Sequence, residues 1–141
     1  MMLNRPLQAF APDTGAAGGQ GSSASTLDPA ALARLAELDP SGANRLLERV
    51  LQAFQASVVR LRPQLAAGRA ADDRAAIRLV THTLKSSSAS IGAMRLSNLC
   101  AEIETAIRLD PSAELGTPLD ALDGALDDTL HAIAAQLGGR G

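Results

Sequence analysis

Residues 119–137, LDALDGALDDTLHAIAAQL, form the most regular apolar pattern in the chain. Leucine or isoleucine recurs at positions 119, 122, 126, 130, 133 and 137, at spacings of three or four residues. This spacing places all of these side chains along one face of an α-helix. The stretch therefore predicts an amphipathic helix whose apolar face must be buried against other helices.

Two further helices with the same kind of apolar pattern are expected in the middle of the chain. The first runs from about Ser41 to Gly68, with Gly68 ending it, and Pro63 inside it predicts a kink or a broken last turn. The second covers residues 70–88, and we expect Asp72 to be its N-cap. Both helices need a partner surface for their apolar faces.

A fourth long helix is expected over residues 93–109, and a short helix over residues 28–38 begins with Asp28 as N-cap and Pro29 in the first helical position. Four long amphipathic helices joined by short loops bury their apolar faces when they pack against one another. The expected fold is all-α: an antiparallel up-and-down four-helix bundle with a short additional N-terminal helix.

Composition agrees with one helical domain. The chain has 141 residues, 46% of them hydrophobic and 1% aromatic, and alanine and leucine favour helices over strands. Residues 11–26 are rich in Gly, Ala and Ser and have no apolar period, which is typical of a flexible segment. We therefore expect a flexible leader over residues 1–26 and the bundle domain over residues 27–138.

Several classes of protein are disfavoured by what the sequence lacks. A single cysteine, Cys100, excludes an internal disulfide, and no Cys/His cluster has metal-ligand spacing, so no bound metal is expected. No segment approaches the roughly 20 apolar residues of a membrane span, and no dense basic patch is interleaved with aromatics. We expect a soluble, cytoplasmic monomer that binds neither nucleic acid nor membrane.

Charge is distributed unevenly along the chain. Residues 27–95 contain ten Lys/Arg and six Asp/Glu, whereas residues 96–141 contain two and eight. Such a separation can steer a charged partner, although most of these residues are also explained as an ordinary solvated surface.

The stretch VTHTLKSSSASIGA, residues 80–93, contains the only lysine and one of the two histidines. At 100° per residue, with Val80 at zero, Leu84 lies near 40° on the core side and His82 lies near 200°. His82 is therefore expected to face solvent, with Lys85 one turn away. A solvated polar side chain is the simplest role for a surface histidine, but a neutral imidazole beside a lysine and small residues is also suited to accept a phosphoryl group.

Residues 82–104, HTLKSSSASIGAMRLSNLCAEIE, resemble the signature of histidine-containing phosphotransfer (HPt) domains. That signature is roughly H-x-L-K-G-S/A-S/A-x-x-x-G, followed by a helix with L-x-x-L/V-C-x-x-I/L-E. The matching positions are His82, Leu84, Lys85, Ser87, Ser88, Gly92, Leu96, Leu99, Cys100, Ile103 and Glu104. The resemblance implies an antiparallel four-helix bundle preceded by a short helix, which agrees with the periodicity.

The resemblance also implies roles for individual residues. His82 would be the phosphoacceptor, modified on Nε2, and Lys85 would screen the phosphoryl oxygens. Gly92 would end the helix and form the turn into the next one. We further propose that Glu104 accepts a hydrogen bond from Nδ1–H of His82 and so fixes the tautomer; the alternative is an ordinary solvated glutamate.

One position departs from the family pattern. Ser86 follows the lysine where the family usually has glycine, and it could narrow access to His82 or add a hydrogen bond to the phosphoryl group. Ser87 and Ser88 are expected to turn toward the core, and Cys100 to be a buried small hydrophobic residue. Receiver docking is expected on one exposed strip of this helix, formed by Ala75, Arg78, Leu79, Ser86 and Ala89.

The function implied by the resemblance is that of a phosphoryl carrier between the aspartates of response-regulator receiver domains in a two-component phosphorelay. A receiver would supply the Mg²⁺, and a hybrid histidine kinase would be a further partner. The sequence has no nucleotide-binding loop, so no kinase activity of its own is expected. Two alternatives are the phosphoacceptor domain of a chemotaxis-type histidine kinase and a helical interaction module that is never phosphorylated.

Overall fold

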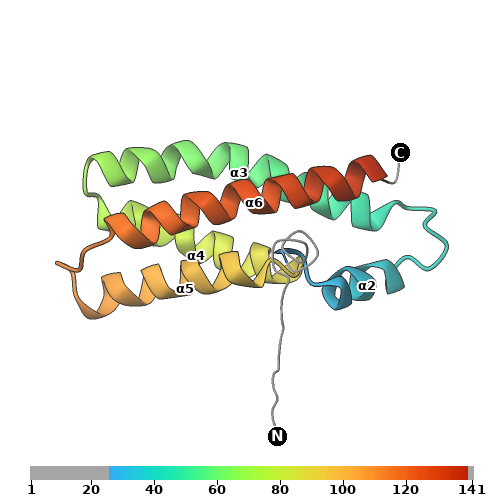
Figure 1. The fold of residues 1–141 in the computed structure, drawn as a ribbon, viewed down its shortest axis with the longest axis horizontal. Coiled ribbons are helices and arrows are strands. Elements are labelled where there is room, and N and C mark those ends of the chain that lie inside the picture. Colours follow the sequence, from blue (N-terminus) through green and yellow to red (C-terminus); the bar gives the residue numbers. More distant parts are fainter. Residues whose placement is uncertain (1–25, 140–141) are drawn as a thin grey trace, which may run out of the picture.

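A computed structural model describes residues 26–139, and within that range five helices follow one another without a strand. They are α2 (Pro29–Glu37), α3 (Leu46–Ala70), α4 (Arg74–Ser90), α5 (Met94–Leu109) and α6 (Gly116–Gly139). The four long helices lie side by side with alternating direction, and α2 lies at the end of the bundle where α4 turns into α5 (Figure 1). The predicted all-α bundle with a short extra helix is confirmed, whereas the predicted leader falls almost entirely outside the described residues.

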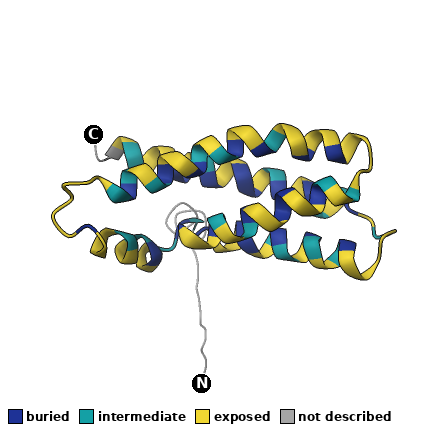
Figure 2. Cartoon of the chain, turned by 180° about the vertical axis from the view of Figure 1, so that it is seen from behind, coloured by how far each residue is buried: buried dark blue, intermediate teal, exposed yellow. Residues whose placement is uncertain are grey.

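The core consists of the apolar faces that the periodicity predicted. Figure 2 shows buried and exposed residues alternating along each long helix, as expected for amphipathic helices. In α6, Leu119, Leu122, Leu126 and Ile133 are buried, while Leu130 and Leu137 are half-buried at its edge. Among the described residues, no helix has the length and apolar content needed to cross a bilayer.

The start of α3 differs from the prediction: the helix begins at Leu46, not near Ser41. The reason is the buried carboxylate of Asp39, which accepts hydrogen bonds from the backbone N–H groups of Asn44 and Leu46 at 3.2 and 3.1 Å. These bonds satisfy helix-start donors from outside the helix, so the intervening residues form a loop instead.

The end of α3 was also predicted wrongly. The helix continues past both Pro63 and Gly68 to Ala70, so it has no broken last turn. Gly68 is buried inside the helix, where a Cβ would lie 3.3 Å from the side chains of Ala76 and Ile77 on α4. Gly68 therefore serves close helix packing and does not end the helix.

The N-cap of α4 is Asp73, not the predicted Asp72. The Asp73 carboxylate accepts the N–H of Ala76 at 3.1 Å, as an N-cap does. Asp72 has a positive φ of 51° and instead accepts a hydrogen bond from Nε of Arg74 at 3.1 Å. The turn between α3 and α4 shifts the cap by one residue.

The turn between α4 and α5 is built around Gly92, as expected. Its φ is +77°, and the N–H groups of Gly92 and Ala93 bind the carbonyls of Ala89 and Ser88 at 3.1 and 2.9 Å. This pattern closes a helix C-terminus and requires a left-handed residue. The carbonyl of Gly92 also accepts the N–H of Asp28 at 2.9 Å, and a Cβ on Gly92 would lie 2.7 Å from that nitrogen. Gly92 therefore lets α2 dock directly on the turn.

Candidate functional site

His82 lies in the middle of α4 on the side that faces away from the core. Its side chain is 62% exposed, whereas Ile77, Val80 and Leu84 on the opposite side are each 1% exposed. The solvent-facing placement predicted from helical geometry is confirmed. The core contacts of α4 fix the helix, so the imidazole stands on a rigid support.

Glu104 on α5 reaches across to α4 and contacts two site residues at once. Its Oε2 lies 2.7 Å from Nδ1 of His82, and its Oε1 lies 2.7 Å from Nζ of Lys85. The Glu104 side chain is only 12% exposed. The hydrogen bond from Nδ1 of His82 that the sequence suggested is present, and Glu104 is not the solvated glutamate of the alternative.

The electrostatics of this cluster determine which imidazole nitrogen is free. The pKa of Glu104 is lowered, chiefly by the hydrogen bond from Lys85 and further by the one from His82, although burial opposes the change. An ionised carboxylate can only accept, so Nδ1 of His82 must carry the proton. In the neutral ring Nε2 is then unprotonated, and its lone pair is available to an incoming group.

Lys85 has a partner that the sequence did not reveal. Its ammonium was expected to face a phosphoryl group on His82, but it is bound to Glu104 at 2.7 Å. Its backbone carbonyl also accepts the hydroxyl of Ser97 on α5 at 2.9 Å. The sequence signal for this ion pair is Glu104, the glutamate that ends the family signature, which the sequence alone pairs only with His82.

The serines after Lys85 have three different environments. Ser86 is exposed one turn after His82. Ser87 is half-buried, and its hydroxyl donates to the carbonyl of Thr83 at 3.1 Å in its own helix. Ser88 is fully buried, and its Oγ has no hydrogen-bond partner among the described residues. The prediction of a core-facing serine is confirmed in full for Ser88 and only partly for Ser87.

The remaining predicted residues are accounted for as follows. Cys100 is fully buried, and burial, with a smaller effect of the Glu104 charge, raises the pKa of its thiol to about 12. The thiol is therefore inert in the folded protein, as expected of a small core residue. All residues predicted for receiver docking are exposed on α4, and their contact with a receiver stays a prediction: Ala75, Arg78, Leu79, Ser86 and Ala89.

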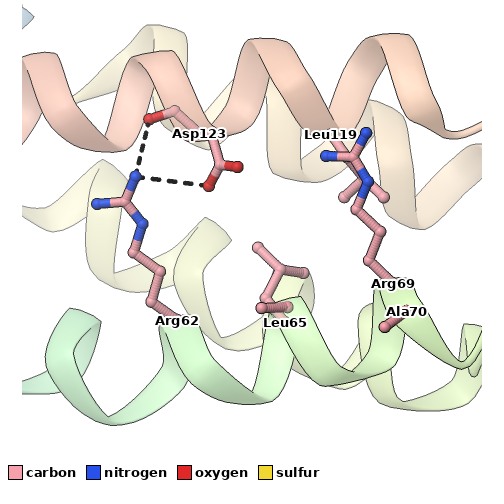
Figure 3. A pocket seen from close by; sticks show the side chains of 7 residues that line it. Arg62, Leu65, Arg69, Ala70, Leu119 and Asp123 are labelled. Atoms are coloured by element: carbon pink, nitrogen blue, oxygen red, sulfur yellow. Dashed lines mark hydrogen bonds and ion pairs between the residues drawn. The ribbon is translucent and has the colours of Figure 1, made fainter.

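A pocket of about 610 Å³ lies elsewhere, between α3 and α6. Figure 3 shows Arg62 and Arg69 extending from α3 toward α6 at its two ends, with Leu65 between them. Arg62 binds Asp123, and Arg69 binds an aspartate on α6 as well. The residues that line the pocket all belong to α3 or α6: Arg62, Leu65, Ala66, Arg69, Ala70, Leu119 and Asp123. This pocket is therefore separate from the exposed side chain of His82.

Comparison with known proteins supports the resemblance seen in the sequence. The family model of the Hpt domain matches residues 49–136. Among solved structures, the chain is similar to the crystal structure of histidine-containing phosphotransfer protein B (HptB) from Pseudomonas aeruginosa PAO1, with 25% sequence identity and a TM-score of 0.67. That match covers 79% of this chain and 93% of the other. Comparison with curated protein sequences gives no match.

Proposed function

Because the chain belongs to the Hpt domain family, we propose that His82 is the residue through which it performs histidine phosphotransfer in a two-component phosphorelay. Domains of this family interact with the receiver domains and kinases of such relays. The observation that carries the assignment is the exposed imidazole whose Nδ1 is bound to the carboxylate of Glu104 at 2.7 Å. In the neutral ring this contact places the proton on Nδ1, so Nε2 has the free lone pair that a phosphoryl acceptor requires.

The chemistry follows from this arrangement. The Nε2 lone pair of His82 forms a bond to phosphorus, the P–O bond to the receiver aspartate breaks, and that carboxylate leaves. The proton on Nδ1 stays in place, so the phosphorylated ring is cationic, and the Glu104 carboxylate 2.7 Å away stabilises that charge. Transfer to a second receiver is the reverse set of bond changes.

The receiver supplies what the bundle lacks. Phosphoryl transfer depends on in-line positioning and on neutralising the phosphoryl oxygens. We assign the Mg²⁺ of the reaction to the receiver pocket and none to this chain. The docking surface is the exposed α4 strip, which presents small side chains and Leu79 at 65% exposed around His82. The upstream donor is a hybrid histidine kinase, and the protein acts as a cytoplasmic monomer.

The test is the substitution His82→Gln, with His131→Gln as the matched control. His131 is exposed on α6, so both variants lose one surface histidine. In H82Q, labelled phosphoryl transfer from a phosphorylated receiver falls to background, while H131Q is labelled like the wild type. Circular dichroism melting verifies that both variants fold.

Labelling of H82Q at the wild-type level would refute the assignment of His82. The phosphodonor separates the two alternatives. Labelling by a chemotaxis-type kinase core with ATP, but not by a receiver, would favour the phosphoacceptor domain of such a kinase. Partner binding without any acid-labile phosphate would favour a non-phosphorylated module.

A further inference from the structure

Two arginines occupy matching positions on α4 and α5, each one helical turn along its helix from the His82–Glu104 contact. Arg78 precedes His82 by four residues, and Arg108 follows Glu104 by four. Because α4 and α5 run antiparallel (Figure 1), Arg78 is displaced from His82 in the same direction along the bundle as Arg108 is displaced from Glu104. Residues four apart are neighbours on one helix face, so Arg78 and Arg108 lie side by side on the face that carries His82.

The guanidinium groups of these two arginines have no counter-ion among residues 26–139, which is also true of Arg95 on α5. Both are exposed, and neither guanidinium group forms an ion pair or hydrogen bond with any residue from 26 to 139. The hydrogen bond from Thr81 to Arg78 goes to the backbone carbonyl and not to the side chain. In contrast, Arg62 and Arg69 each bind aspartates on α6. Two like charges held side by side repel each other unless an anion lies between them.

The expected cation for the phosphoryl group, Lys85, is already neutralised. Its ammonium is bound to Glu104 at 2.7 Å, and that carboxylate also binds His82. The three groups together have no net charge when His82 is neutral. A phosphoryl group on His82 brings nearly two negative charges, and the cationic ring balances only one of them, so about one negative charge remains.

Position on the two helices makes the arginines candidates for the balancing cations. Helical side chains lean toward the N-terminus of their own helix. The ring of His82 therefore leans toward the turn that contains Arg78, and Arg108 leans back along α5 toward Glu104. Arg78 itself leans toward the preceding turn, so its long side chain has to fold back to reach the ring. We propose that Arg78 and Arg108 form an arginine pair that binds the phosphoryl oxygens on His82, while Lys85 stays bound to Glu104. This proposal rests on His82 being the phosphoacceptor.

The chemistry of the guanidinium group suits this role. Each guanidinium presents paired N–H donors to phosphoryl oxygens, and it is always charged. The arginine pair should therefore stabilise the dianion of the phosphoryl group over its protonated monoanion. The pair should act even when no receiver is bound, which distinguishes it from a docking contact.

The test uses phosphoramidate as a small-molecule donor, so that no receiver is present. Nε2 of His82 bonds to phosphorus, the P–N bond of phosphoramidate breaks, and ammonia leaves. The phosphorylated wild type, R78Q/R108Q and the control R34Q/R95Q are then titrated by ³¹P NMR. The control removes the same two charges from exposed positions on α2 and on the far end of α5.

The phosphoryl pKa in R78Q/R108Q is expected to rise by about half to one pH unit over that of the wild type, with little change in the control. The lysine variant R78K/R108K should restore part of the difference. An unchanged titration in R78Q/R108Q, with slower transfer from a receiver, would overturn the proposal and assign the arginines to docking. Phosphoramidate labelling that persists in H82Q would instead overturn the phosphoacceptor assignment itself.

Discussion

The α4–α5 interface and the α3–α6 groove both contain charged groups that link two helices, but in opposite environments. Between α4 and α5, Glu104 is 12% exposed and contacts His82 and Lys85 at 2.7 Å each. Between α3 and α6, Arg62 and Arg69 bind aspartates whose side chains are 51–73% exposed, around a pocket of about 610 Å³. The carboxylate of Glu104 is thus largely buried, whereas the carboxylates that bind Arg62 and Arg69 are exposed to solvent.

This difference distinguishes the proposed functional cluster from the ion pairs between α3 and α6. Exposed ion pairs contribute about 0–1 kcal/mol each because solvent and salt screen them. A sheltered carboxylate with two short partners is held in one geometry, which is what orienting an imidazole requires. The α4–α5 pair therefore offers the geometry that the proposed site needs, whereas the exposed ion pairs between α3 and α6 do not.

The largest expected effect compares apolar truncations in the two regions. Ile103 on α5 is fully buried, whereas Leu119 on α6 lines the pocket. Ile103→Ala should lower the free energy of unfolding by about 2–5 kcal/mol. Leu119→Ala should lower it by at least about 1 kcal/mol less, because the loss of stability grows with the volume of the closed cavity that the truncation creates, and Leu119 already borders an open pocket. Urea unfolding measures both, and equal losses would show that the groove is packed as tightly as the α4–α5 interface.

A smaller effect, on rate, is expected from Glu104→Gln. The amide cannot hold both His82 and Lys85 as an ionised carboxylate does, so transfer from a receiver should slow by about tenfold to a hundredfold. Glu102→Gln, an exposed position on the same helix, is the control. Nitrogen-15 NMR of His82 should show mixed tautomers in E104Q, and an unchanged rate with a single tautomer would contradict the orienting role.

The same variant should change the dependence of stability on pH. The pKa of Glu104 lies below its ordinary value of 4.5 in the folded protein, chiefly because of Lys85. Its carboxylate therefore stabilises the fold above that value, and this stabilisation is lost as the pH falls through the folded pKa. E104Q should lose less stability than the wild type between neutral and acidic pH, as measured by thermal melting.

The smallest effect is expected from Arg62→Gln in the groove. Its ion pairs with Asp123 and Asp127 are exposed, so the free energy of unfolding should fall by less than about 1 kcal/mol. The difference from the wild type should shrink further in 1 M salt, and phosphotransfer should not change. A slower transfer in this variant would mean that the groove is coupled to the site.

The interiors of the helices could be predicted from the sequence, and their ends could not. Apolar spacing determines which face is buried, and burial dominates the fold. The residue at which a helix begins depends on which nearby group accepts hydrogen bonds from the free backbone N–H donors of its first turn. For α3 that group is the carboxylate of Asp39, which lies outside the helix. Asp72 and Asp73 are adjacent and chemically identical, so only the path of the turn selects the cap. A glycine at position 68 indicates a helix end in the sequence, because its actual role, close packing against α4, leaves no local sequence pattern.

The site was predictable to the extent that it lies on one helix. The exposure of His82 follows from helical geometry alone, and its hydrogen bond to Glu104 followed from the family signature. The binding of Lys85 by the same carboxylate depends on the register between α4 and α5 and on side-chain direction. No spacing within one helix contains that information.

The burial of Cys100 gives the molecule a built-in reporter. It is the only thiol in the chain, it lies on α5 one turn before Glu104, and its raised pKa of about 12 leaves almost no thiolate at neutral pH. A thiol reagent can modify it only when the bundle opens. The rate of alkylation therefore measures how often the α4–α5 interface separates, without any engineered label.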